Sequence, residues 1–155
     1  RWERLASEHP GRLDPWSRRH LDWLVSAQER ARDAVRGNTL LHVDLRADNL
    51  LITGDQVMVV DWPHARIGAA WIDLAAMAPS VAMQGGPDPN DLLLRHPAAR
   101  DADPEAITTF IALLAGYFLY QAALPAPPDI PTVRAFQRAQ GEVARAWLAR
   151  RLGWP

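Results

Sequence analysis

The stretch that decides the fold is "LLHVDLRADNLLI", residues 40–52, where polar side chains interrupt an apolar run. The interrupting residues are His42, Asp44, Arg46, Asp48 and Asn49. Polar groups between buried segments must be hydrogen-bonded, solvated or bound to a ligand, because leaving them unpaired in a core costs several kcal/mol, about 2–7. A surface turn would explain the last two of these residues. It does not explain the histidine and the carboxylate that precede them, so this loop is a candidate functional site.

Composition limits the classes of protein to consider. The chain has 155 residues, 48% of them hydrophobic, a net charge of −1 and no cysteine. It therefore suits about one globular domain, and its charge gives no support for a nucleic-acid partner. Disulfides and thiolate metal sites are excluded. All basic residues are arginine, so no chemistry in this chain can use a lysine. No signal peptide follows the charged first residues, and we expect a cytoplasmic location.

One uncharged run, residues 107–128, is long enough to span a bilayer. It contains Gly116 and Gln121, ends in a proline cluster and lacks flanking basic residues. These features favour a buried core helix, so no membrane partner is expected.

The rest of the chain is predicted to be mostly helical. Asp14 followed by Pro15 is a typical helix start, and Gly37 is a typical end. The predicted helical segments are residues 2–9, one long amphipathic helix over 15–36, residues 69–83, an apolar helix opened by Asp103 and Pro104, and a last one opened by Pro131. Residues 84–103, rich in Gly, Pro and Asp, are predicted to form a loop.

Three short segments favour strands: "TLLHV", "NLLIT" and "VMVVDW". The last two flank Gly54 and Asp55, which predicts a tight hairpin. The open ends of such a hairpin are neighbours, so Asn49 and Asp61 should lie together with Asp44 on the loop that leads in. Oxygen ligands from these ends would suit Mg²⁺, and Asp44 could then act on an attacking hydroxyl. The alternative is an ordinary hairpin with solvated acidic ends.

The order of these residues favours a functional site over an ordinary hairpin. His42, Asp44, Asn49 and then Asp61 follow the order of kinase catalytic loops. "HVDLRADNLLI" together with "VVDWPHARIGAAWIDLA" resembles the aminoglycoside phosphotransferase family, a protein-kinase-like group that includes choline and homoserine kinases. The motifs cover residues 39–76. The resemblance implies that residues 1–155 form a kinase-like C-terminal lobe: a helix over 15–36, a catalytic loop and hairpin over 39–62, and a helical subdomain over 69–155.

The resemblance also implies roles for the loop residues. Asp44 would be the catalytic aspartate that orients or deprotonates the acceptor hydroxyl. Asn49 and Asp61 would bind Mg²⁺ and, through it, ATP or GTP. Arg46 would lie near the transferred phosphate. Leu51 would lie under the adenine ring.

Two further residues would support the site. Asp73 in "DLA" corresponds to a buried aspartate that holds the catalytic loop from a helix start. His42 is interpreted as a hydrogen-bonded organiser of the loop rather than a proton carrier. Trp62 and His64 are given no chemical role.

The chain departs from the family pattern at several points. Val43 stands where the family often has glycine, and Trp62–Pro63 stands where many members have a second acidic residue, which leaves a second metal site open. The family's N-terminal β-lobe, with its phosphate-binding lysine, has no counterpart before His42. We therefore expect residues 1–155 alone to be inactive, with apolar surface exposed around Leu51 and available for self-association.

Three functions remain open from the sequence. The favoured one is transfer of the γ-phosphate of ATP or GTP to a small-molecule hydroxyl. The second is a non-catalytic binding or scaffold domain that kept the fold. The third, a metal-dependent hydrolase, lacks histidines at paired ligand spacing. The acidic residues of the predicted loop over 84–103 could attract a cationic acceptor such as an aminoglycoside, or could simply be solvated.

Overall fold

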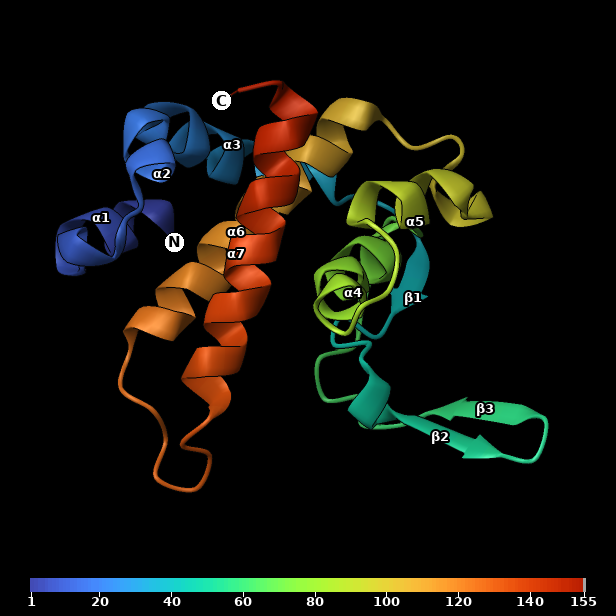
Figure 1. The fold of residues 1–155 in the computed structure, drawn as a ribbon. Helices are drawn as coiled ribbons and strands as arrows, with labels where there is room; N and C mark the ends of the chain where they lie inside the picture. The colour runs from blue at the N-terminus through green and yellow to red at the C-terminus, as the bar shows by residue number, and fades with distance from the viewer. Residues whose placement is uncertain (155) are drawn as a thin grey trace. The chain divides into compact units, whose positions relative to one another are not determined.

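The structure, a computed structural model, describes residues 1–154 as two units (Figure 1). One unit comprises residues 1–34 together with the chain from Pro104 onward, and the other is Val35–Asp103. The boundary between the two units falls at Pro104, within the segment over 69–155 that the sequence predicted as a helical subdomain. The division follows from packing, since α6 (Pro104–Ala123) packs against α7 (Val133–Leu152) and also against α1 (Trp2–Glu8) and α3 (Leu21–Ala34).

The first unit is entirely helical. Its elements are α1 (Trp2–Glu8), η1 (Pro10–Arg12), α2 (Pro15–Arg19), α3 (Leu21–Ala34), α6 (Pro104–Ala123) and α7 (Val133–Leu152). The two long helices α6 and α7 run side by side (Figure 1). Glycines allow close packing here, because a Cβ at Gly116 would lie 2.6 Å from the indole nitrogen of Trp2. That nitrogen donates a 2.8 Å hydrogen bond to the carbonyl of Ala112.

Helix α6 is the uncharged segment that raised the question of a membrane span. Among residues 1–154 it is the one helix long and apolar enough to cross a bilayer. Half of its most apolar window is nevertheless buried inside the protein, at 50%. A core helix meets the same test of length and composition, so the finding is weak evidence for a membrane span.

The long helix predicted over 15–36 is wrong in one respect, because the structure breaks it at His20. Asp14 caps α2 as predicted, accepting from the amides of Trp16 and Ser17. His20 has φ −106° and ψ 17°, and its ring stacks on Trp154 with centroids 4.5 Å apart. Aromatic packing with a residue far along the chain accompanies the break, and sequence periodicity does not reveal such a contact.

The second unit carries all the strands. β2 (Leu50–Thr53) pairs with β3 (Gln56–Val59) as the predicted hairpin, turning at Gly54 with φ +63°. β1 (Thr39–Leu41) pairs instead with β4 (Arg66–Gly68), an antiparallel partner that the sequence analysis missed. β4 has only three residues, too few to show an alternating pattern.

The remaining elements of this unit are helical. They are η2 (Ala47–Asn49), α4 (Ile72–Met83), α5 (Pro89–Arg95) and η3 (Pro97–Ala99). The prediction of a loop over 84–103 is therefore wrong in part. Asp88 caps α5 by accepting from the amide of Asn90 at 2.9 Å, and Pro89 occupies the first turn. This is the same Asp–Pro signal that marks the start of α2.

Candidate active site

The loop between β1 and β2 is fixed from the start of α4. The carboxylate of Asp73, in the first turn of α4, accepts hydrogen bonds from two successive backbone amides. The amide of His42 lies 2.8 Å from Oδ2, and the amide of Val43 lies 2.7 Å from Oδ1. Asp73 is half-buried, rather than fully buried as the resemblance implied. Its carboxylate ties the loop to the helix.

His42 uses both ring nitrogens within the site. It is 2% exposed, and its Nε2 lies 2.8 Å from the carbonyl of Val60. Its Nδ1 accepts from the amide of Asp44 at 3.3 Å, so Nε2 is the nitrogen that donates to Val60. Because both nitrogens are engaged, His42 links the loop to the end of β3 and has no nitrogen left for proton transfer.

Asn49 joins the loop to the hairpin. Its side-chain amide donates to the carbonyl of Asp44 at 2.8 Å, and it is 6% exposed. Its own carbonyl accepts from the amide of Val60 at 3.0 Å. The latter bond sets Asn49 beside the residue that precedes Asp61. This bond lies at the open end of the hairpin, where β2 begins and β3 ends.

Asp61 is the carboxylate that follows β3. It is exposed, has φ +63°, and forms no ion pair with any residue among 1–154. Its neighbour Trp62 packs edge-on against His42, with centroids 4.8 Å apart, and donates its indole N–H to Val59 at 2.9 Å. Sequence analysis gave Trp62 no role, although it braces the ring of His42; no pattern in the sequence signals this contact.

The donor set at Asn49 and Asp61 fits a hard cation. An amide oxygen and a carboxylate are ligand types that Mg²⁺ prefers, and Mg²⁺ commonly takes few protein ligands together with phosphate oxygens and water. Within residues 1–154, no group of three or more His, Cys, Asp or Glu side chains is arranged to hold a metal. A metal site here would thus have few protein ligands, and a bound ligand would complete the coordination of the ion.

Arg46 lies between two carboxylates. Its Nε is 3.5 Å from Asp44 Oδ1, and its terminal nitrogen is 2.7 Å from Asp48 Oδ2. The Asp48 side chain is 65% exposed, so this second pair contributes little to stability. The guanidinium nevertheless lies close to the Asp44 carboxylate.

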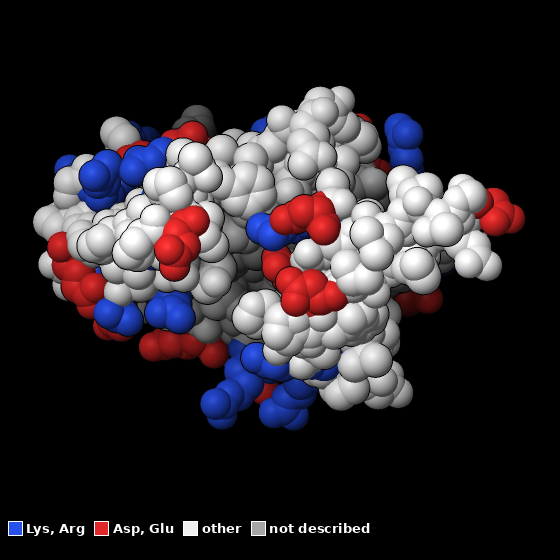
Figure 2. All heavy atoms as spheres, turned by 90° about the horizontal axis from the view of Figure 1, so that it is seen from below, with Lys and Arg blue, Asp and Glu red and all other residues white. Residues whose placement is uncertain are grey.

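The hairpin carries apolar side chains on both faces. Leu51 pairs with Met58 on one face, at 49% and 47% exposure, and Ile52 pairs with Val57 on the other. Figure 2 shows the hairpin as the arm at the right, almost free of charged groups. The predicted apolar surface around Leu51 is therefore present in this unit.

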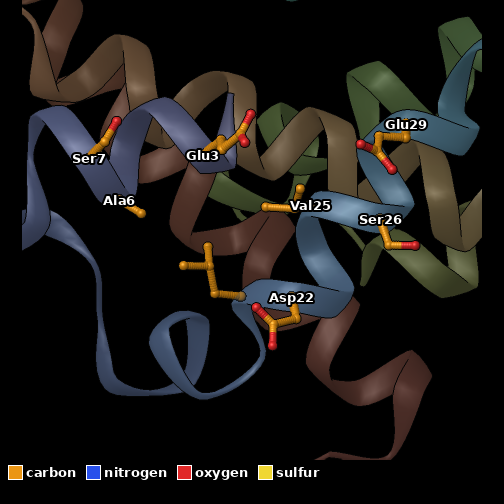
Figure 3. Close-up of a pocket in the computed structure, with 8 residues that line it drawn as sticks. Glu3, Ala6, Ser7, Asp22, Val25, Ser26 and Glu29 are labelled. Carbon is orange, nitrogen blue, oxygen red and sulfur yellow. The ribbon is translucent and has the colours of Figure 1, made fainter.

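A separate hollow lies in the helical unit, between α1 and α3 (Figure 3). It has a volume of about 560 Å³, and its lining includes Ala6, Leu21 and Val25. Glu3 and Glu29 stand at its edge and are exposed. Acidic residues on exposed helix faces are ordinary, and none of the predicted site residues lines this hollow.

The sequence model of the phosphotransferase enzyme family matches residues 1–151. The chain belongs to that family. The match spans the loop, the hairpin and the helices on both sides of them, so every predicted site residue of the chain lies inside it. The same chain matches no curated protein and no solved structure.

The structure accounts for two acidic residues of the segment over 84–103. Asp88 is occupied as a helix cap, and Asp91 lies in the first turn of α5, where a carboxylate favours the helix dipole. Both acidic residues thus have a structural explanation. A cationic acceptor is not needed to account for them.

Proposed function

We propose that this phosphotransferase moves the γ-phosphate of ATP or GTP to a hydroxyl group of a small molecule. The observation that carries the proposal is the pair of hydrogen bonds that Asp73 accepts from the loop amides, together with the bond that Asn49 donates to the Asp44 carbonyl. These bonds fix the main chain on both sides of Asp44. A surface loop without a function does not need its backbone held at three points.

Asp44 would act on the acceptor. Its carboxylate is partly exposed, at 38%, so a hydroxyl from solvent can reach it. It would orient that hydroxyl and accept its proton as the phosphoryl group arrives, a role worth about 10²–10⁴ in rate. His42 would not carry this proton, because both of its nitrogens are already bonded.

Asn49 and Asp61 would hold Mg²⁺ with the nucleotide. The bound ion would neutralise charge on the β- and γ-phosphates. The amide nitrogen of Asn49 is committed to Asp44, so its oxygen is the atom left for a ligand. One residue would thereby link the cation to the acceptor-activating aspartate.

Arg46 would contact the transferred phosphoryl group. Its planar guanidinium suits phosphate oxygens, and it already lies 3.5 Å from the Asp44 carboxylate. A phosphoryl group brought to this position would contact both Arg46 and the bound cation. Leu51, half-exposed on β2, would support the adenine ring from one side.

We further propose that a β-rich lobe outside residues 1–155 completes the nucleotide site. Support comes from the apolar pair Leu51–Met58, whose exposure is explained if another element covers it. The sequence contains no lysine to pair with the phosphates. Losing one charge-assisted phosphate contact weakens binding by about 1.5–3 kcal/mol. Residues 1–155 alone should bind Mg-ATP no better than in the millimolar range.

The experiment is a phosphotransfer assay on the intact protein, expressed from its complete reading frame. Radiolabelled ATP and GTP would be offered with a panel of hydroxylated acceptors that includes aminoglycosides, choline and homoserine. Label on at least one acceptor, dependent on Mg²⁺, supports the proposal. Tight Mg-nucleotide binding without transfer to any acceptor would favour the binding-domain alternative, and turnover by residues 1–155 alone would overturn the proposed lobe.

A further inference from the structure

The hollow between α1 and α3 is lined by one face of each helix. Its lining residues recur three or four residues apart, which is the spacing of neighbours on a helix surface. They are Glu3, Ala6 and Ser7 on α1, and Leu21, Asp22, Val25, Ser26 and Glu29 on α3. The hollow is open to solvent rather than enclosed. Two adjacent helix faces around an open hollow form the kind of groove in which proteins bind a further helix.

Part of this lining is apolar. Ala6, Leu21 and Val25 are half-buried, so a bound apolar side chain would remove more of their surface from water. Apolar surface of this kind does not by itself identify a ligand. The charged groups beside it indicate what kind of partner would bind.

The lining also carries three carboxylates, and Figure 3 shows that they come from both helices: Glu3, Asp22 and Glu29. All three residues are exposed, and none forms an ion pair with a side chain among residues 1–154. The next residues in the chain after the two glutamates are Arg4 and Arg30, and they bond instead to another carboxylate at 2.7 Å and to a serine hydroxyl at 2.6 Å. The described part of the chain therefore supplies no counter-charge to this acidic lining.

The spacing of the carboxylates matches that of a helix. Asp22 and Glu29 are separated by two turns of α3, or about 10 Å. Cationic side chains two turns apart on a partner helix would meet both of them. The helix dipole explains the acidic residues at Glu3 and Asp22, which lie in first turns, but it does not explain Glu29 in the middle of α3.

We propose that the hollow between α1 and α3 docks a basic amphipathic helix of a protein partner. The apolar face of that helix covers the apolar lining, and its flanking arginine or lysine side chains pair with the three carboxylates. Charge complementarity determines the sign of the partner, and the two lining helix faces determine its shape. The docking site lies wholly in the helical unit and uses none of the residues proposed for phosphoryl transfer.

The first test is a titration of the intact protein with a fluorescently labelled helical peptide of leucine and lysine, whose leucines form one face and whose lysines lie on both sides of it. We expect fluorescence anisotropy to show binding that weakens as the salt concentration rises, because exposed ion pairs are screened. The same peptide with glutamate in place of lysine should not bind. Equal binding of the two peptides would overturn the proposal.

Variants of the hollow locate the binding. The combined variant Glu3→Gln, Asp22→Asn, Glu29→Gln should bind the leucine–lysine peptide about tenfold more weakly, since each exposed ion pair contributes little and three are lost. The matched control removes three exposed carboxylates elsewhere: Asp101→Asn, Asp129→Asn and Glu142→Gln. The control should bind like the unchanged protein. If both combined variants lose affinity equally, the peptide is held by overall charge and the proposal is wrong.

The apolar half of the proposal needs a separate variant. Val25→Ser changes no charge, and it should weaken peptide binding severalfold while the melting temperature changes little. Spermidine has the charge of the peptide without an apolar face, so at equal ionic strength it should not displace the peptide. Displacement by spermidine would indicate a site for small cations and overturn the proposal. A dimer in sedimentation that the combined variant of the hollow dissociates would also overturn it, because the occupant would then be a second copy of the chain.

Discussion

The side-chain amide of Asn49 donates a 2.8 Å hydrogen bond to the main-chain carbonyl of Asp44, and this bond joins the proposed metal ligand to the proposed base. Asn49→Asp removes the donor and sets a carboxylate against a carbonyl oxygen. Because that buried bond is lost and replaced by repulsion, we expect a loss of about 1–3 kcal/mol in the free energy of unfolding. Chemical denaturation of the intact protein measures it. Asn38→Asp, at an exposed position, is the control and should have little effect. Equal stability of the two variants would mean that the Asn49 bond is not formed.

Asp61→Asn should weaken binding of the Mg-nucleotide. The substitution removes a charged oxygen from the proposed cation site without changing its size. We expect the dissociation constant to rise by about tenfold or more, since a contact to a charged group contributes roughly 1.5–3 kcal/mol. Isothermal titration calorimetry with Mg-ATP on the intact protein is the measurement. Asp55→Asn at the tip of the hairpin is the matched control. If Asp61→Asn binds Mg-ATP as tightly as Asp55→Asn does, Asp61 is not part of the cation site.

Asp73→Ala should reduce both stability and activity. It leaves the amides of His42 and Val43 without their acceptor, at a cost of about 1–3 kcal/mol for each group that stays unpaired. Thermal unfolding should show a fall of several degrees for the intact protein. Asp101→Asn, exposed in the connection before α6, provides the reference for loss of one surface charge. A thermally silent Asp73→Ala would show that α4 does not anchor the loop.

The helical unit should show a pH dependence that originates at Glu8. Its carboxylate accepts from Arg4 at 2.7 Å and from the Tyr120 hydroxyl at 2.9 Å, and these bonds hold the pKa of Glu8 below its usual range. A lowered pKa stabilises the folded state at pH values above the unfolded pKa of about 4.3, and that contribution is lost as the pH falls through the folded pKa.

The measurement compares melting temperatures of the unchanged protein and Glu8→Gln between pH 7 and pH 3. The unchanged protein should melt higher at pH 7, and the difference should close below about pH 4. Glu3→Gln, on the same helix and also exposed to solvent, controls for loss of one negative charge. A difference that is constant across this range would contradict the assignment.

The hairpin and the loop could be predicted from the sequence because their signals are local. Gly54 and Asp55 mark the turn, and the Asp14–Pro15 pair marks a helix start, both through backbone preferences of a few adjacent residues. The break at His20 could not be predicted in this way, because its ring packs on Trp154, which is far along the chain. The overlooked helix α5 had the same local signal as α2, and the Gly- and Pro-rich surroundings outweighed it.

The same contrast applies to the candidate site. The order of His42, Asp44, Asn49 and Asp61 is readable in the sequence, and the closeness of Asn49 to the end of β3 follows from the geometry of a hairpin. The left-handed turn at Val43 and the bracing of His42 by Trp62 depend on long-range contacts. The spacing of residues in the sequence does not reveal these contacts. These contacts hold the loop in place, whereas the motif specifies only which residues the loop contains.

The most direct test of the central claim is the rate of phosphoryl transfer in the intact protein with Asp44→Asn, measured in single turnovers at saturating Mg-nucleotide. We expect that rate to fall by about 10²–10⁴, with nucleotide affinity nearly unchanged, because Asp44 would act on the acceptor hydroxyl and not on the nucleotide. Asp48→Asn, which alters the neighbouring carboxylate bonded to Arg46, should retain most of the rate. An Asp44→Asn protein that transfers phosphate at a near-normal rate would contradict the account.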